Sequence, residues 1–207
     1  MIEKIQSKHT YRYALYGNPN AKNLLYVLHG YGQLAPYFIG KFNSLENYFI
    51  VAPEGMHRFY LNGSSGRVGA SWMTKEERLD DIEDNCNWLC DLNSKIIGAQ
   101  SYDKIIILGF SQGGATAARW FYDKRMHADH LIMWASVFPP DLSPEDLIDP
   151  LSKNNLFILG TRDEYFDKEQ QKEALAFYSM HGFRTISYPG KHDICIETLA
   201  DSFNHLK

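Results

Sequence analysis

The segment Gly109–Gly113 reads G-F-S-Q-G and has a spacing, G-x-S-x-G, that could hold a nucleophilic serine. It directly follows the apolar run Ile105–Leu108 and directly precedes a stretch of small residues typical of a helix packed on a sheet. At a sharp turn from strand to helix the hydroxyl of Ser111 would stand clear of the sheet, and the glycines would avoid steric collisions. The N–H groups at the start of the helix would face developing negative charge.

The spacing alone is weak, because it arises by chance in about one of fifteen chains of this length. The alternative is a glycine-rich turn that only packs strand on helix. Two further strand ends decide between these interpretations. The run Leu156–Leu159 leads to Asp163, and the run Thr185–Tyr188 leads to His192. Ser, Asp and His in this chain order are typical of a serine nucleophile at such a turn, so we expect a Ser111–His192–Asp163 catalytic triad.

Each of these groups has a chemical reason to be there. A serine hydroxyl is a weak nucleophile, so His192 must take its proton and later return it to the leaving group. Asp163 would orient the imidazole and stabilise its charged form. Glu164 and Asp167 are rival acids, and Asp163 is favoured because it lies nearest to the strand end.

A further strand end supplies candidate donors for an oxyanion. The run Leu24–Leu28 is followed by H-G-Y-G, in which glycines let the backbone turn an N–H towards the reacting oxygen. We expect the backbone N–H groups of Tyr31 and Gln112 to form the oxyanion hole, with Gly32 as an alternative to Tyr31. His29 is interpreted as structural, and His57, further along the chain, could touch substrate.

The elements that must position these residues have the pattern of an α/β fold. Six short apolar runs are closed by turn signals, and several are continuous, as in parallel strands covered on both faces. The runs are Leu24–Leu28, Tyr48–Ala52, Ile105–Leu108, Leu131–Trp134, Leu156–Leu159 and Thr185–Tyr188. Helical patterns between or after them are Lys75–Ile97, Gln112–Met126, Asp167–His181 and Ile194–Leu206. The stretch Tyr11–Tyr16 would suit an antiparallel edge strand. The alternation of strands and helices predicts one domain over residues 1–207, built on a largely parallel sheet with helices on both faces.

Composition narrows the function classes. The net charge is −4 and no Lys/Arg cluster occurs, which disfavours a nucleic-acid partner. The three cysteines are a poor disulfide framework, and Cys86 and Cys90 lack further ligands for zinc. No apolar run reaches membrane-spanning length and the N-terminus lacks a leader pattern, so we expect a cytoplasmic protein.

The motifs together resemble the α/β-hydrolase superfamily, specifically the phospholipase/carboxylesterase group that includes acyl-protein thioesterases. They are L-H-G-Y-G (28–32), G-F-S-Q-G-G (109–114), G-T-R-D (160–163) and G-K-H-D (190–193). The resemblance implies a serine esterase or thioesterase without a cofactor and with one compact domain, and the chain leaves little room for a separate lid domain. It also implies the same triad and the same oxyanion donors. The acid motif departs from the His-Gly-x-x-Asp usual in acyl-protein thioesterases, which bears on the substrate. Alternatives are a peptidase or lyase on the same scaffold, or a non-catalytic binding module.

Two long connections, Glu54–Thr74 and Ser136–Ser143, follow strand ends at the edge where such sheets bind ligands. They are the expected walls of a pocket for a small ester or thioester substrate. The expected lining residues are Phe59, Tyr60, Trp72, Met73 and Phe138. Each could equally cover the edge of the core. Arg58 and Arg67 could meet an anionic group on the substrate.

Overall fold

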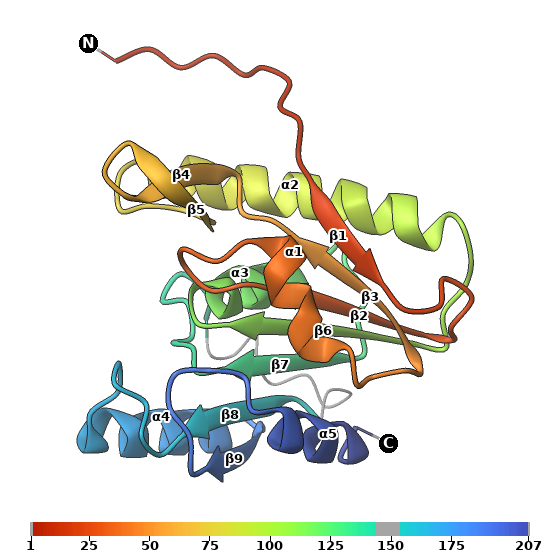
Figure 1. Cartoon of the computed structure of the whole chain (residues 1–207), viewed down its shortest axis with the longest axis vertical. Coiled ribbons are helices and arrows are strands. Elements are labelled where there is room, and N and C mark those ends of the chain that lie inside the picture. Colours follow the sequence, from red (N-terminus) through yellow and green to blue (C-terminus); the bar gives the residue numbers. More distant parts are fainter. Residues whose placement is uncertain (1, 144–153, 207) are drawn as a thin grey trace.

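The computed structural model describes residues 2–143 and 154–206, and its centre is a seven-stranded sheet (Figure 1). The strand order is β1-β3-β2-β6-β7-β8-β9, with β1 antiparallel to β3 and every other pairing parallel. The strands are β1 (Tyr13–Tyr16), β2 (Asn23–Leu28), β3 (Tyr48–Pro53), β6 (Lys104–Phe110), β7 (His130–Trp134), β8 (Leu156–Gly160) and β9 (Arg184–Tyr188). The predicted parallel sheet, with an antiparallel strand at its edge, is confirmed.

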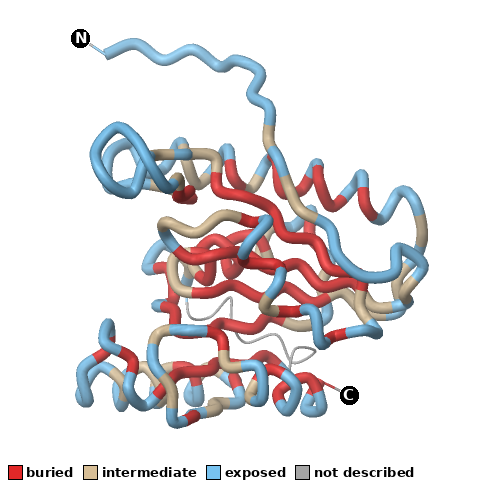
Figure 2. The backbone as a smooth tube through the Cα atoms, in the orientation of Figure 1, coloured by how far each residue is buried: buried red, intermediate tan, exposed pale blue. Residues whose placement is uncertain are grey.

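The central strands are apolar on both faces because helices cover both. Figure 2 shows the middle of the sheet as buried backbone, and every residue of β8 is buried. The register aligns the strand ends: Leu28 lies opposite Gly109, Phe110 opposite Trp134, and Gly160 opposite Tyr188. The turns that follow these parallel strands therefore meet at one edge of the sheet.

Five helices and one 3₁₀ turn pack on this sheet in the described part of the chain. They are α1 (Ala35–Phe38), the 3₁₀ turn η1 (Ile39–Phe42), α2 (Arg78–Ile97), α3 (Gln112–Phe121), α4 (Lys168–Met180) and α5 (Ile196–Asn204). Figure 1 shows α1 and α5 in front of the sheet and α2, α3 and α4 behind it. None of the described helices combines the length and the apolar character needed to cross a membrane.

The helix ends differ from the predicted ones for local reasons. Helix α2 begins at Arg78 rather than Lys75, because Glu77 before it has a left-handed backbone with φ 48°. Helix α3 ends at Phe121 rather than Met126. At the end of α4, Gly182 has φ 81°, the left-handed conformation expected of a glycine that stops a helix.

The connection Glu54–Thr74 was expected to be irregular, and the structure corrects this. It folds into a hairpin of β4 (His57–Asn62) and β5 (Ser65–Ser71), separate from the main sheet. The two turn residues at the tip are Gly63 and Ser64, and Gly63 has the φ of 61° that a two-residue hairpin turn with glycine first requires. The polar, largely exposed residues of β4 hid the strand, since they lack the alternation of a half-buried one.

Candidate active site

Ser111 lies at a strained turn between β6 and α3. Its φ of 52° and ψ of −122° fall in a region that L-residues rarely adopt, and its N–H donates to Trp134 O at 2.9 Å, which anchors the turn to β7. The neighbouring glycines are required by packing. A Cβ on Gly109 would lie 2.5 Å from Gly113 O, and one on Gly113 would lie 2.4 Å from His29 O. The sharp turn thus depends on both glycines.

His192 and Asp163 form a hydrogen-bonded pair at the same sheet edge. The Nδ1 of His192 lies 2.7 Å from Asp163 Oδ2, and the Asp163 side chain is fully buried. The other carboxylate oxygen, Oδ1, accepts the N–H of Tyr165 at 2.9 Å. Because an ionised carboxylate can only accept, Nδ1 carries the proton and Nε2 is left as the basic atom. The rings of Phe110 and Tyr165 pack against the imidazole at centroid distances of 4.8 and 4.5 Å.

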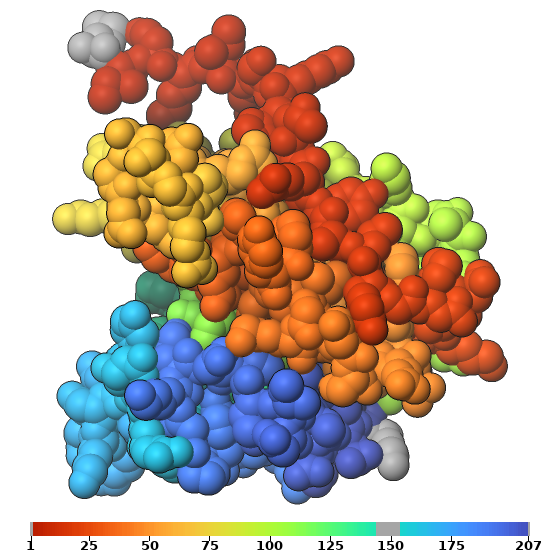
Figure 3. All heavy atoms as spheres, viewed as in Figure 1, coloured from red at the N-terminus to blue at the C-terminus, as the bar shows by residue number. Residues whose placement is uncertain are grey.

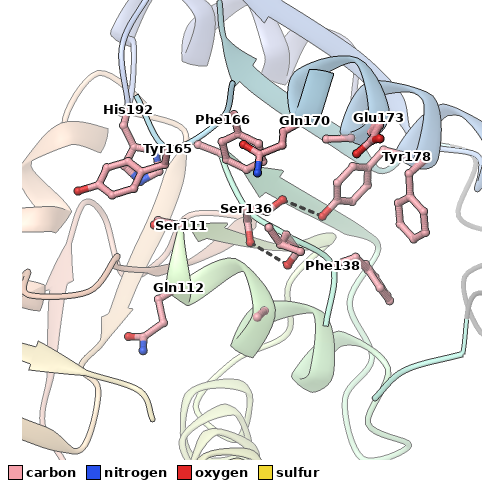
Figure 4. A pocket seen from close by; sticks show the side chains of 15 residues that line it. Ser111, Gln112, Ser136, Phe138, Tyr165, Phe166, Gln170, Glu173, Tyr178 and His192 are labelled. Carbon is pink, nitrogen blue, oxygen red and sulfur yellow. Dashed lines mark hydrogen bonds between the residues drawn. The ribbon is translucent and has the colours of Figure 1, made fainter. Parts of the chain in front are cut away.

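Ser111 and His192 line the same cavity, of about 540 Å³ (Figure 4). Both residues are described, and no hydrogen bond joins them in the structure. Loose contact between nucleophile and base is common before substrate binds. The three groups singled out from strand ends are therefore brought together, with the acid–base contact already formed.

The rival acids have other partners. Glu164 Oε2 accepts the backbone N–H of His192 at 3.3 Å, so it holds the loop and not the ring. Asp167 caps α4 by accepting the N–H groups of Glu169 and Gln170, each at 2.9 Å.

Two other histidines are placed away from the reacting groups. His29 is fully buried, and burial lowers its pKa to about 4. Its Nδ1 donates to Gly30 O at 2.8 Å, and its Nε2 accepts the N–H of Gly55 at 3.0 Å. The neutral ring is a structural bridge. His57 lies on β4 and contacts Asp81 at 3.0 Å, outside the cavity.

In the described part of the chain, the turn after β2 leaves the backbone N–H of Tyr31 unpaired, whereas the two N–H groups that follow it are bonded. The N–H of Gly32 donates to Ala70 O at 2.9 Å and that of Gln33 to Gly30 O at 3.2 Å. Among the described residues, the N–H of Tyr31 has no acceptor. A Cβ on Gly30 would lie 3.3 Å from Ser111 Cβ, which shows how closely this turn approaches Ser111. The bond of Gly32 to Ala70 favours Tyr31 over Gly32 as the donor.

The side chain of Gln112 fixes the start of α3, a role not foreseen from the sequence. Its Oε1 accepts the N–H of Trp72 at 3.1 Å, and its Nε2 donates to Met73 O at 2.8 Å. In Figure 4 this side chain points away from the other labelled residues of the cavity. The contacts tie the helix to the end of β5, so the Gln112 N–H at the first turn of α3 is held in place. No described residue accepts that N–H.

From Ser111 the cavity extends as an apolar groove between α3, the segment after β7, and α4. We call this the α3–α4 groove; its apolar lining includes Ala115, Val137, Phe138, Phe166, Ala174 and Phe177. Tyr178 supports its floor by donating its hydroxyl to Ser136 O at 3.0 Å (Figure 4). The segment after β7 is pinned by a bidentate pair: Arg119 Nε and Nη2 bind Asp141 at 2.8 and 2.6 Å. The guanidinium holds the pKa of Asp141 below its usual range.

Of the five residues expected to line the pocket, the structure brings only Phe138 to the groove. Trp72 is fully buried, and its indole N–H donates to His29 O at 2.8 Å. Met73 contributes its carbonyl to Gln112. Phe59 packs on the Tyr31 ring at 5.1 Å, and Tyr60 is half exposed on the hairpin.

The residues that α4 contributes to the groove were not among those predicted from the sequence. Their signal was the spacing of Ala174, Phe177 and Tyr178, which places them on one face of the helix.

The structure also gives the surroundings of Arg58, Arg67 and the three cysteines. Arg58 lies 3.6 Å from the buried Glu54, while Arg67 lines a different cavity. Cys86, Cys90 and Cys195 are free thiols, and burial raises the pKa of Cys86 to about 11. No cluster of three or more His, Cys, Asp or Glu side chains suited to a metal ion occurs in residues 2–143 and 154–206.

The chain is similar in sequence to one family of hydrolases and similar in fold to several solved esterases and thioesterases. Residues 20–199 match the model of the serine hydrolase (FSH1) family, whereas no curated protein matches the chain. The fold is shared with esterase PE8, at 19% identity and a TM-score of 0.70 over 96% of this chain and 100% of that one. Acyl-protein thioesterase 2 of Zea mays has 17% identity and a TM-score of 0.70 over 95% and 99%. A phospholipase/carboxylesterase of Dyadobacter fermentans has 19% identity and a TM-score of 0.63 over 98% and 99%. The chain has the α/β-hydrolase fold and belongs to the FSH1 serine hydrolase family.

Proposed function

We propose that this serine hydrolase cleaves carboxylic esters or thioesters, with Ser111 as nucleophile, His192 as base and Asp163 as the orienting acid. The observation that carries the proposal is the 2.7 Å contact of His192 Nδ1 with the buried Asp163, beside a serine held at φ 52° in the same cavity. This arrangement leaves Nε2 of the imidazole free to accept the serine proton.

The reaction follows from these positions. Ser111 Oγ attacks the carbonyl carbon while Nε2 of His192 takes its proton. The oxyanion that forms accepts the N–H groups of Tyr31 and Gln112. The tetrahedral intermediate then expels the alcohol or thiol, which takes the proton from the imidazolium and leaves an acyl-enzyme. Water activated by the same imidazole attacks the acyl-enzyme and releases the carboxylic acid.

The α3–α4 groove suits an apolar part of the substrate, because it opens from Ser111 and its far walls are aromatic and aliphatic. Its volume of about 540 Å³ is of the size that holds small ligands. We further propose that the protein acts as one domain in the cytoplasm, where a reducing environment suits three free cysteines.

The test is labelling with a fluorophosphonate probe, with a matched serine as control. Ser111 and Ser136 line the same cavity, so Ser111→Ala and Ser136→Ala remove hydroxyls from the same environment. We expect wild type and Ser136→Ala to label and Ser111→Ala to remain unlabelled. The labelled proteins should also hydrolyse p-nitrophenyl butyrate and a butyryl thioester. A wild type that neither labels nor turns over these substrates contradicts the proposal.

A further inference from the structure

A second cavity, of about 710 Å³, is lined in part by the turn after β2. We call it the hairpin cavity; it is lined by Gly32, Gln33, Leu34, Tyr37, Phe38, Lys41, Gly66, Arg67 and Val68. Three elements build it: the turn that carries Tyr31, the α1–η1 segment, and strand β5 of the hairpin. Figure 3 shows the orange α1 segment and the yellow hairpin side by side on one face of the molecule.

The charged groups on its wall are both cations. Arg67 and Lys41 line the cavity, and no carboxylate is among the described residues that do, although the chain as a whole carries a net charge of −4. Lys41 is partly neutralised, because its Nζ binds Asp193 Oδ1 at 2.7 Å. Arg67 is exposed and makes no ion pair or side-chain hydrogen bond with any described residue. The unbalanced charge of the cavity therefore comes from Arg67.

The contrast with Arg58 is informative. Both arginines belong to the hairpin, but Arg58 lies 3.6 Å from Glu54 and lines neither this cavity nor the groove. Of these two arginines, only Arg67 has a guanidinium without a partner among the described residues, and such a group can bind a carboxylate or phosphate through two parallel hydrogen bonds.

Several residues on the wall of the hairpin cavity are neighbours, in sequence or in packing, of residues of the proposed catalytic centre. Gly32 and Gln33 on its wall directly follow Tyr31, whose N–H is the proposed oxyanion donor. Phe38 packs on Phe110 at 6.1 Å, and Phe110 packs on His192 at 4.8 Å. Asp193, the partner of Lys41, directly follows His192 in the chain. A ligand in the hairpin cavity would therefore lie next to the turn that carries Tyr31, while Ser111 and His192 themselves line the α3–α4 groove.

We propose that the hairpin cavity is a second substrate subsite, which binds an anionic group of the ester or thioester through Arg67, with Lys41 beside it. The inference rests on the proposed function and adds a substrate class to it. The substrate carries an apolar arm for the α3–α4 groove and a carboxylate or phosphate for the hairpin cavity, with the scissile carbonyl between them.

The kinetic test compares charged and neutral esters. Wild type, Arg67→Gln and the control Arg58→Gln are assayed with p-nitrophenyl butyrate, with p-nitrophenyl hydrogen glutarate, and with a butyrate ester of 4-hydroxybenzoate. The second substrate places a carboxylate on the acyl side and the third on the alcohol side. For each protein we compare kcat/KM for an anionic ester with kcat/KM for the neutral ester. We expect Arg67→Gln to lower this ratio about fivefold to tenfold for one of the two anionic esters. The effect is smaller than for a buried arginine, because the guanidinium is exposed to solvent. Arg58→Gln should keep the wild-type ratio, and 0.5 M salt should shrink the difference.

A binding measurement separates this proposal from the proposed function. Monomethyl glutarate is titrated calorimetrically, at low salt, into the Ser111→Ala protein and into the same protein carrying Arg67→Gln. At least fivefold weaker binding in the double variant supports the anionic subsite even if turnover fails. Equal affinity, together with an unchanged kinetic ratio for both anionic esters, overturns it while leaving neutral-ester hydrolysis intact.

Discussion

The α3–α4 groove predicts how activity depends on acyl length, and a single substitution should abolish that dependence. Ala174 lies on the groove wall in α4, whereas Ala176 lies two residues away on the exposed face of the same helix. Ala174→Trp places an indole in the groove, and Ala176→Trp places the same group in solvent. The pair holds residue type, helix and added volume constant while changing only occupancy of the groove.

The magnitude follows from burial of methylene groups. Full burial of one CH₂ is worth about 0.8 kcal/mol, or about fourfold in kcat/KM. The groove is partly open, because Ala174 and Phe177 are only half-buried and Glu173 is exposed. Taking roughly half of the full value gives about twofold per methylene, or roughly sixteenfold from butyrate to octanoate.

The assay is kcat/KM for p-nitrophenyl esters from two to ten carbons, below their critical micelle concentrations. Wild type and Ala176→Trp should show the rise to octanoate, and Ala174→Trp should show a ratio of octanoate to butyrate near one. A flat wild-type profile would refute the assignment of the groove to the substrate. A rise that survives Ala174→Trp would place the apolar arm elsewhere.

Two more predictions concern the acid and the groove wall. Asp163→Asn should lower kcat about 10⁴-fold with the fold intact, because an amide no longer selects the reactive tautomer of His192. Glu164→Gln removes only a contact to a backbone N–H and should lower kcat less than about tenfold. If Glu164→Gln lowers kcat more than Asp163→Asn does, the acid must be reassigned. Asp141→Asn should lower the free energy of unfolding in urea by about 1–3 kcal/mol, less than for a fully buried pair, because the Asp141 side chain is 31% exposed beside Arg119. Since the folded-state pKa of Asp141 is lowered, this difference should be full above pH of about 4 and vanish as the pH falls through the folded-state pKa, so a difference that grows in acid would contradict it.

The strands and the edge that carries the reacting groups could be predicted because both are local in sequence. Continuous apolar runs mark β2, β6 and β8, and parallel order forces their carboxyl ends together. Ser111, Asp163 and His192 are each a few residues beyond such an end, so their meeting needed no knowledge of side-chain packing.

The pocket walls could not be predicted in the same way, because they depend on tertiary approach. Trp72 follows a strand end, as a pocket residue would, but its indole N–H is satisfied by His29 O beneath the sheet edge. Phe177 lines the groove only because α4 packs against the segment after β7. The type of a side chain predicts whether it is buried. Whether it then lies in the core or on a pocket wall depends on residues that are distant in the sequence.

The turn after β2 and the hairpin are joined by two main-chain hydrogen bonds, beside the ring contact of Tyr31 with Phe59. Gly32 N–H donates to Ala70 O at 2.9 Å, and Ala70 N–H donates to Gln33 O at 3.0 Å. A Cβ on Gly69 would lie 2.5 Å from Gly32 O, so the joint demands glycine there and asks little of the side chains around it. The hairpin tip can therefore exchange residues such as Arg67 during evolution without moving the backbone beside Tyr31. A substitution at Arg67 could therefore change the proposed substrate preference without altering the proposed oxyanion hole.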